Sequence, residues 1–146
     1  MSEISDQLIP WQTKFGRNNL PWQSTINPYL VWVSEVMLQQ TQVKTVLPYY
    51  QKFITKFPSV KTLALADEEE VMQLWSGLGY YARARNLHAS AKIIDSKFQG
   101  NFPTILTDLL SLPGIGRSTG GAICSLAFNQ KTPILDGNVK RVFTRV

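Results

Sequence analysis

The stretch Leu112-Pro113-Gly114-Ile115-Gly116 joins two segments with helical apolar spacing and turns the chain sharply between them. Because glycine has no Cβ atom, Gly114 and Gly116 allow a hairpin turn without side-chain clashes. The turn directs the first amide groups of the next helix outward, where the helix dipole also favours an anion. The stretch therefore predicts a backbone site for a phosphate, although a helix–helix turn that binds nothing has the same signature.

The rest of the sequence also predicts helices joined by short turns, and no alternating apolar pattern indicates a strand. Asn27 followed by Pro28 is a capping residue followed by a favoured first helical residue. Asp67 forms a capping-box pattern with Glu70, and Ser59 and Thr104 are each expected to cap a further helix. The expected helices cover residues 28–39, 43–57, 60–66, 67–75, 81–97, 104–111 and 117–128, with a last one from residue 137. The predicted fold class is all-α.

Composition narrows the class of protein. The chain has 146 residues, of which 44% are apolar and 17% charged, as expected for a folded soluble domain. No apolar run approaches the length of a membrane span, and residues 1–12 do not resemble a secretory signal. The single cysteine, Cys124, excludes an internal disulfide framework and any cluster that needs several cysteine ligands from this chain.

The net charge of +5 is distributed unevenly. Residues 1–73 carry six Lys/Arg and seven Asp/Glu, whereas residues 74–146 carry nine Lys/Arg and three Asp/Glu. A basic half beside a neutral one is typical of a surface that binds phosphates, although many basic surfaces bind nothing in particular.

Two carboxylates stand in unlike surroundings. Glu35 is the only ionisable side chain in residues 28–38, and its apolar neighbours would favour the neutral form that a general acid needs. The alternative is a glutamate on a solvated helix face. Asp136 stands at the expected start of the last helix, where backbone amides would keep it ionised. It is either an ordinary capping residue or a fixed anion that stabilises a cationic sugar.

Two polar and aromatic loops complete the candidate site: residues 39–42, with three glutamines and a threonine, and residues 77–86, with two tyrosines and two arginines. Glutamine can fill the space of an extruded base, tyrosine can wedge into a base stack, and arginines suit phosphates. A buried aromatic turn with a solvated arginine face is the competing interpretation.

Taken in order, these segments resemble the MutY-type adenine DNA glycosylases, a family of the helix-hairpin-helix superfamily. The matching runs are residues 20–23, 28–29, 31–32, 34–43, 74–87, 112–119 and 134–142, in the family's order and spacing. The resemblance implies a helix-hairpin-helix DNA glycosylase fold with its hairpin motif at about residues 105–128. It also implies excision of adenine mispaired with 8-oxoguanine or guanine, with double-stranded DNA as the partner.

The resemblance assigns roles residue by residue. Glu35 matches the acid that protonates the adenine, Asp136 the carboxylate that stabilises or captures the oxocarbenium-like sugar, and Asn138 an active-site asparagine. Gln40 and Tyr80 match positions that intercalate into the duplex. The full set expected to contact substrate or DNA is Trp22, Gln40, Thr41, Tyr80, Arg83, Arg85, Leu112, Gly114, Gly116, Ser118 and Lys140.

Ser118 separates sibling chemistries. Bifunctional relatives place a lysine here, whose amine forms a Schiff base and leads to strand cleavage. Because serine cannot form that imine, the resemblance implies base removal without lyase activity. For the same reason Ser118 argues against the activity of endonuclease III-type relatives, which excise damaged pyrimidines.

The family also has features that this sequence lacks. They are further helices, four cysteines that hold a [4Fe–4S] cluster, and usually a C-terminal domain that recognises 8-oxoguanine. Residues 1–146 are therefore expected to be a partial catalytic domain without the cluster: N-terminal helices, a six-helix-barrel portion, the hairpin motif and the start of the helix after Asp136.

An apolar stripe on the last expected helix predicts a missing C-terminal half or self-association; its residues are Val139, Val142, Phe143 and Val146. The expected location is the bacterial cytoplasm, near the nucleoid. Besides a glycosylase, two alternatives stay open: a non-catalytic DNA-binding remnant that uses residues 112–119, and a truncated product without function.

Overall fold

A computed structural model describes residues 3–16, 19–24 and 26–130, and every regular element in these ranges is helical. The all-α prediction is confirmed there, while the helix expected from residue 137 lies outside the described residues. No helix in the described part is long and apolar enough to cross a membrane. The elements are α1 Glu3–Phe15, η1 Pro21–Ser24, α2 Pro28–Leu38, α3 Val43–Lys56, α4 Val60–Leu65, α5 Glu68–Trp75, α6 Ala82–Lys97, α7 Leu106–Leu110 and α8 Arg117–Phe128.

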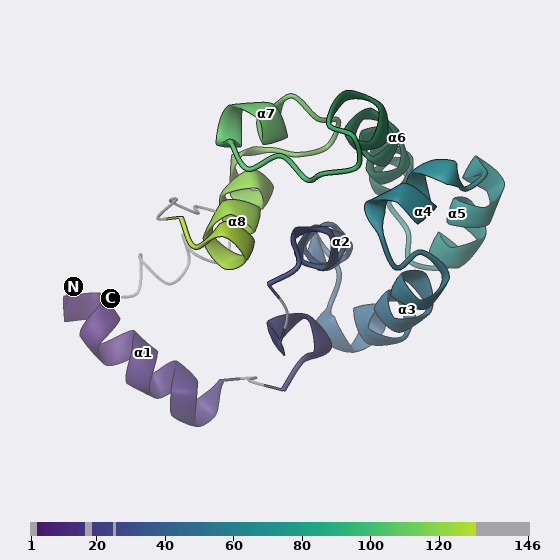
Figure 1. The fold of residues 1–146 in the computed structure, drawn as a ribbon. Coiled ribbons are helices and arrows are strands. Elements are labelled where there is room, and N and C mark those ends of the chain that lie inside the picture. The colour runs from purple at the N-terminus through teal and green to yellow at the C-terminus, as the bar shows by residue number, and fades with distance from the viewer. Residues whose placement is uncertain (1–2, 17–18, 25, 131–146) are drawn as a thin grey trace.

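Helix α2 lies in the middle of the fold, in contact with α3, α6 and α8 (Figure 1). Its start is fixed as predicted: the Asn27 side-chain oxygen accepts a hydrogen bond from the Tyr29 amide at 2.9 Å, and Pro28 occupies the first turn. Most of its residues are apolar and buried, which is typical of a helix covered on several sides. The candidate acid Glu35 is thus placed on the central helix of the fold.

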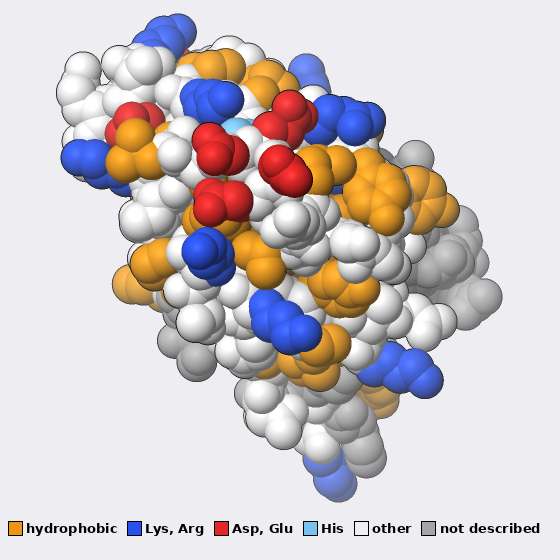
Figure 2. Space-filling view, turned by 90° about the vertical axis from the view of Figure 1, so that its right-hand side faces the viewer, with side chains coloured by type: hydrophobic (Ala, Val, Ile, Leu, Met, Phe, Trp, Pro, Cys, Tyr) orange, Lys and Arg blue, Asp and Glu red, His pale blue; other side chains and the backbone are white. Residues whose placement is uncertain are grey.

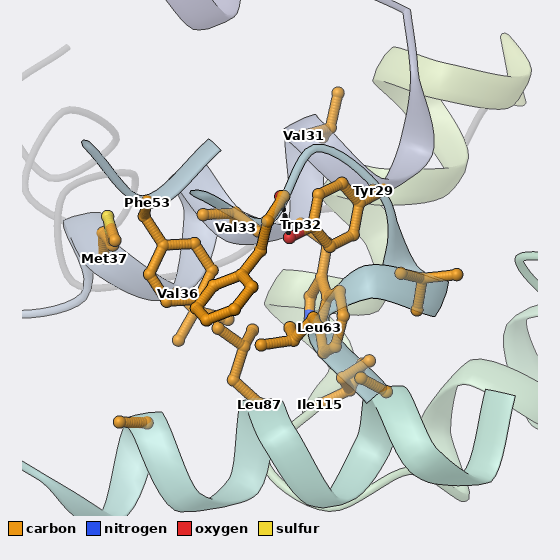
Figure 3. Packing of buried hydrophobic residues seen from close by; sticks show 14 of the residues in the cluster. Tyr29, Val31, Trp32, Val33, Val36, Met37, Phe53, Leu63, Leu87 and Ile115 are labelled. Carbon is orange, nitrogen blue, oxygen red and sulfur yellow. Dashed lines mark hydrogen bonds between the residues drawn. The ribbon is translucent and has the colours of Figure 1, made fainter. Parts of the chain in front are cut away.

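The core forms where other elements close over α2 (Figure 3). The ring of Trp32 is 1% exposed and packs edge-on against Phe102, with 5.3 Å between ring centroids. Leu63 of α4, Leu87 of α6 and Ile115 of the hairpin lie around it in the same cluster. Because Ile115 belongs to this core, the hairpin turn is anchored to the domain by packing as well as by chain connectivity.

Several helix boundaries follow the sequence pattern and others do not. The Thr62 amide donates to Ser59 Oγ at 3.2 Å, and the Asp67 amide donates to Glu70 Oε2 at 3.4 Å, in line with the predicted caps. The prediction that Thr104 caps a helix is wrong. α7 begins two residues later, after Ile105, and the Thr104 carbonyl instead accepts from Gln130 Nε2 at 3.0 Å.

N-terminal helices were expected from the resemblance, but the bounds of α1 and η1 were not predicted. Pro10 lies inside α1, and a proline within a helical segment removes one backbone hydrogen bond. Such a residue weakens the sequence signal for a continuous helix over residues 3–15.

Acidic side chains gather on one face of the molecule (Figure 2). The first turn of α5 carries Glu68, Glu69 and Glu70, all exposed, where negative charge complements the helix dipole. This end of the fold lies across the molecule from α7 and α8 (Figure 1). The hairpin between α7 and α8 is therefore separated from the most acidic surface among the described residues.

Candidate nucleic-acid interface and active site

The hairpin turn between α7 and α8 depends on one of its two glycines for its shape. Gly114 has φ +77°, a left-handed conformation that side chains rarely adopt. A Cβ atom added there would lie 2.9 Å from Cβ of Asn86 in α6, which is too close. Gly114 is thus required both for the turn and for the close approach of the hairpin to α6.

Gly116 differs from Gly114. Its φ is −89°, which any residue adopts, and an added Cβ would meet nothing within 4 Å. The expectation that this glycine serves the turn conformation is therefore wrong. The residue precedes the first turn of α8, where amide groups have no intrahelical partner. The open space at Gly116 leaves these amides accessible to an approaching anion.

Side chains of α6 support the hairpin from behind. Ser90, fully buried, donates from Oγ to the Pro113 carbonyl at 2.8 Å. Leu112 and Ile115 are also buried, so these side chains anchor the turn while its backbone faces outward. Leu112, expected to contact DNA, can therefore do so only through its backbone. Ser90 was not predicted to support the hairpin, because the sequence shows only that it lies one helical turn after Asn86.

Each of the two polar loops presents one residue other than glycine in a left-handed conformation. Gln40 has φ +56° and is exposed, and Tyr80 has φ +50° and is 62% exposed. Left-handed backbone is uncommon for residues other than glycine and is often found at functional sites. The loops therefore place at the surface the two side chains that the resemblance assigns to intercalation.

The two arginines that follow Tyr80 have unlike environments. Arg85 is exposed, as a phosphate contact requires. Arg83 is half-buried and donates to backbone carbonyls, among them that of Gln39 at 2.6 Å, and to Thr41 Oγ1 at 3.2 Å. The structure therefore presents Arg85 to solvent and directs Arg83, together with Thr41, into the protein.

Glu35 is half-buried on α2, one turn before Gln39. Gln39 Nε2 donates to Thr119 Oγ1 of α8 at 2.9 Å, which joins the end of α2 to the helix that follows the hairpin. Ser118, half-buried, precedes Thr119 in the first turn of α8. Glu35 and Ser118 thus lie on two helices that meet at the Gln39–Thr119 bond.

Of the remaining predicted site residues, only Trp22 is described, and it lies in η1, which contacts α2. Asp136, Asn138 and Lys140 lie outside the described residues. Trp22, half-buried in η1, packs edge-on against Tyr50 of α3 with 5.2 Å between ring centroids. The described structure thus gives Trp22 an aromatic packing partner.

A small cavity lies where α2, α6 and the hairpin meet. Its volume is about 40 Å³, which is room for a few water molecules and not for a nucleobase. The lining residues are Trp32, Val36, Gln39, Arg83, Asn86, Leu87, Pro113 and Gly114. This cavity is therefore a junction between the loops and the hairpin, distinct from a base-binding pocket.

The donors for an iron–sulfur cluster are not present in this chain. A [4Fe–4S] cluster needs four cysteine thiolates, and the sequence has one cysteine. Burial of Cys124 in α8 raises the pKa of its thiol, which disfavours the thiolate. Among the described residues, no three His, Cys, Asp or Glu side chains are grouped to hold a metal ion.

Residues 33–146 match the HhH-GPD superfamily of base excision DNA repair proteins. The chain is 55% identical over 138 residues to the adenine DNA glycosylase of Buchnera aphidicola subsp. Baizongia pistaciae, covering 94% of this chain and 39% of that protein. It is 47% identical over 148 residues to the adenine DNA glycosylase of Homo sapiens, covering 95% and 27%. The chain thus spans well under half the length of these relatives.

Two solved structures share the fold. A thermostable thymine-DNA glycosylase matches with a TM-score of 0.87 and 27% identity, covering 94% of this chain and 64% of that one. A non-covalent endonuclease III–DNA complex matches with a TM-score of 0.79 and 24% identity, covering 96% and 65%. The helical architecture is therefore that of DNA glycosylases of this superfamily.

Proposed function

The chain belongs to the HhH-GPD superfamily of base excision DNA repair proteins, and from that premise we propose that it carries the adenine-excising machinery of a DNA glycosylase. The proposed substrate is adenine mispaired with 8-oxoguanine or guanine in double-stranded DNA. The single observation that carries the proposal is geometric. Glu35 lies on the central helix α2. The C-terminal end of α2 leads into the loop of Gln40 and is bonded through Gln39 to α8, the helix that follows the hairpin.

DNA docking begins with the hairpin. Its backbone amides at the start of α8 would bind a phosphate without reading sequence. Gln40 and Tyr80, both exposed, would enter the base stack and favour extrusion of the adenine. Arg85 and Lys140 would add phosphate contacts.

Two carboxyl groups would then divide the chemistry. Glu35 donates a proton to the adenine ring, and the bond between C1′ and N9 breaks with its electron pair leaving on the base. The Asp136 carboxylate stabilises the cationic sugar that remains, with Asn138 beside it in the sequence. Water adds its oxygen to C1′ and releases a proton, which leaves an abasic site.

Ser118 makes the proposed reaction monofunctional. Its hydroxyl cannot form the imine through which a lysine cleaves the strand. Adenine should therefore be lost without a break in the DNA, and breaks should appear only after heat and alkali. A cluster such as the [4Fe–4S] of the resembling family would need thiolates from outside this sequence. The proposed location, close to bacterial chromosomal DNA, follows from the substrate.

Glu35→Gln tests the acid directly, because the amide keeps the size of the side chain and cannot donate the proton. We expect excision to fall by about 10²–10⁴-fold, with affinity for the duplex retained. Equal excision by Glu35→Gln and the wild-type chain would refute the role of Glu35.

Non-catalytic DNA binding is the second candidate, because the hairpin and the exposed Gln40, Tyr80 and Arg85 could contact DNA without any catalytic carboxylate. It requires binding that weakens steeply as salt rises, without an abasic product. Affinity that does not respond to salt would exclude it.

A further inference from the structure

The guanidinium group of Arg83 lies at the end of α2, where unpaired carbonyl groups give the helix a partial negative charge. Three carbonyl oxygens at this end of α2 accept from the same terminal nitrogen, Nη1. They belong to Val36 at 2.9 Å, Met37 at 3.0 Å and Gln39 at 2.6 Å. Arg83 therefore terminates α2 from a position 44 to 47 residues further along the chain.

The other nitrogens of the same group reach both polar loops. Nη2 donates to Thr41 Oγ1 and to the Gly79 carbonyl, each at 3.2 Å. Nε donates to the Tyr80 carbonyl at 3.4 Å. One side chain thus joins residues 39–41 to residues 79–80, which are far apart in the sequence.

These contacts fall beside Gln40 and Tyr80, the residues other than glycine that have left-handed backbone in the two loops. Gln39 and Thr41 flank Gln40, and the Gly79 and Tyr80 carbonyls belong to the peptide groups on either side of the Tyr80 Cα atom. A left-handed conformation is unfavourable for these residues and persists only where neighbouring contacts hold it. Arg83 supplies such contacts to both at once.

The donors of Arg83 are occupied within the protein. Its guanidinium carbon also lies 5.3 Å from the Trp75 ring centroid and 5.4 Å from that of Tyr80. Burial lowers the pKa of Arg83, and the nearby Tyr80 raises it in part. Its charge is thus directed to carbonyl oxygens and aromatic rings, whereas that of Arg85 is exposed.

We propose that Arg83 is a positioning residue that holds the Gln40 and Tyr80 loops together for entry into the base stack, and that it is not a phosphate ligand. This inference rests on the proposed function. Only a planar group with several fixed donors reaches carbonyls and a hydroxyl on three segments at once. Lysine keeps the charge but not this geometry, so Arg83→Lys separates positioning from phosphate binding.

The first experiment uses duplex DNA with 2-aminopurine opposite 8-oxoguanine, because 2-aminopurine fluorescence rises when the base leaves the stack. At saturating protein, Arg83→Lys should lose most of this rise, while the slope of log affinity against log salt stays at the wild-type value. The matched control Arg85→Gln should keep the rise and lower the slope by about one. A full rise with Arg83→Lys, or a lowered slope with Arg83→Gln, would overturn the proposal.

Thr41→Val serves if Arg83→Lys does not fold, because it removes one acceptor and conserves the shape of the side chain. A partial loss of the fluorescence rise is expected, again with an unchanged salt slope. A full rise would contradict the role of Arg83.

Amide hydrogen exchange tests the inference without DNA. In Arg83→Lys the amides of residues 39–41 and 79–81 should exchange faster together, whereas Arg85→Lys should match the wild-type chain. Faster exchange in one loop alone, or in neither, would refute the link between them. A wild-type chain that does not bind DNA would refute the proposed function, and hydrogen exchange would still decide the role of Arg83.

Discussion

At the scale of single residues, Gly114 and Gly116 stand two positions apart in the hairpin and serve different purposes. The backbone at Gly114 is left-handed and packs closely on Asn86, whereas Gly116 has an ordinary conformation and open space around it. Sequence alone treats the two glycines alike, since only the φ angles and the neighbouring α6 distinguish them.

Substitution by alanine separates these roles. Gly114→Ala should lower the free energy of unfolding by about 1–3 kcal/mol, because it combines a left-handed alanine with a clash. Gly116→Ala should leave stability unchanged or raise it by about 0.4–1 kcal/mol, yet weaken DNA binding by crowding the phosphate. Urea unfolding and DNA titration of both variants check this. Equal losses of stability at the two positions would contradict the assignment.

His88 is the only histidine in the sequence and is buried on α6. Its Nε2 lies 2.9 Å from the Ala66 carbonyl at the end of α4. Burial lowers the pKa of His88, with Lys92 acting in the same direction, while the Ala66 and Leu63 backbone and Glu68 oppose the shift. The folded protein therefore holds His88 neutral at neutral pH.

This pKa shift predicts a pH dependence of stability. The unfolded chain binds a proton to His88 more readily than the folded one. Stability from this group is thus present above a pH of about 6.5 and is lost as pH falls toward the lowered folded-state pKa. Melting temperatures between pH 7 and 5 should fall less in His88→Gln than in the wild-type chain. The same decline in both proteins would argue against the shift.

At the scale of elements, α6 organises the face that we propose for DNA. Arg83 holds the two loops, Asn86 contacts Gly114, and Ser90 donates to Pro113. These positions are three, four and seven residues apart, so they share one face of the helix. Because Arg83 contacts the loops and Ser90 contacts the hairpin, the stretch of α6 between them sets the distance between the loops and the hairpin.

Ser90→Ala tests the contact between α6 and the hairpin. The half-buried Pro113 would lose the donor to its carbonyl, at a cost of about 1 kcal/mol in the free energy of unfolding. Ser96→Ala on the same helix removes an exposed hydroxyl bond to Ile93 and should change stability by no more than about 0.5 kcal/mol. Denaturant unfolding compares the two variants. A Ser90→Ala protein as stable as Ser96→Ala would show that the bond does not support the hairpin.

Local signals in the sequence predicted where the helices and turns lie, but they did not predict which elements contact one another. Caps at Asn27, Ser59 and Asp67 and the glycine turn at Gly114 are properties of a few neighbouring residues. Three of the acceptors of Arg83 are backbone carbonyls more than 40 residues away, and a carbonyl is present at every position of the chain. No sequence pattern marks which carbonyls will meet an arginine, so its inward orientation was found only in the structure.

At the scale of the whole molecule, α7 and α8, which the hairpin joins, lie across the fold from α5 with its acidic first turn (Figure 1). The excess of Lys/Arg in residues 74–146 predicted a basic second half, and the ordered motifs predicted the superfamily. The packing of α2 at the centre was not evident, because an apolar helix does not specify its neighbours. The two carboxylates that we propose as catalytic, Glu35 and Asp136, were predicted from their surroundings in the sequence, and Asp136 lies outside the described residues.

We propose that this chain excises adenine, and the first measurement to make is single-turnover excision on duplex DNA with adenine opposite 8-oxoguanine. Product is measured by strand breaks after heat and alkali, with Asp136→Asn beside the wild-type chain. We expect abasic product from the wild-type chain, none from Asp136→Asn, and no breaks before alkali. Absence of product from the wild-type chain, with salt-sensitive DNA binding retained, would refute adenine excision and leave a DNA-binding protein.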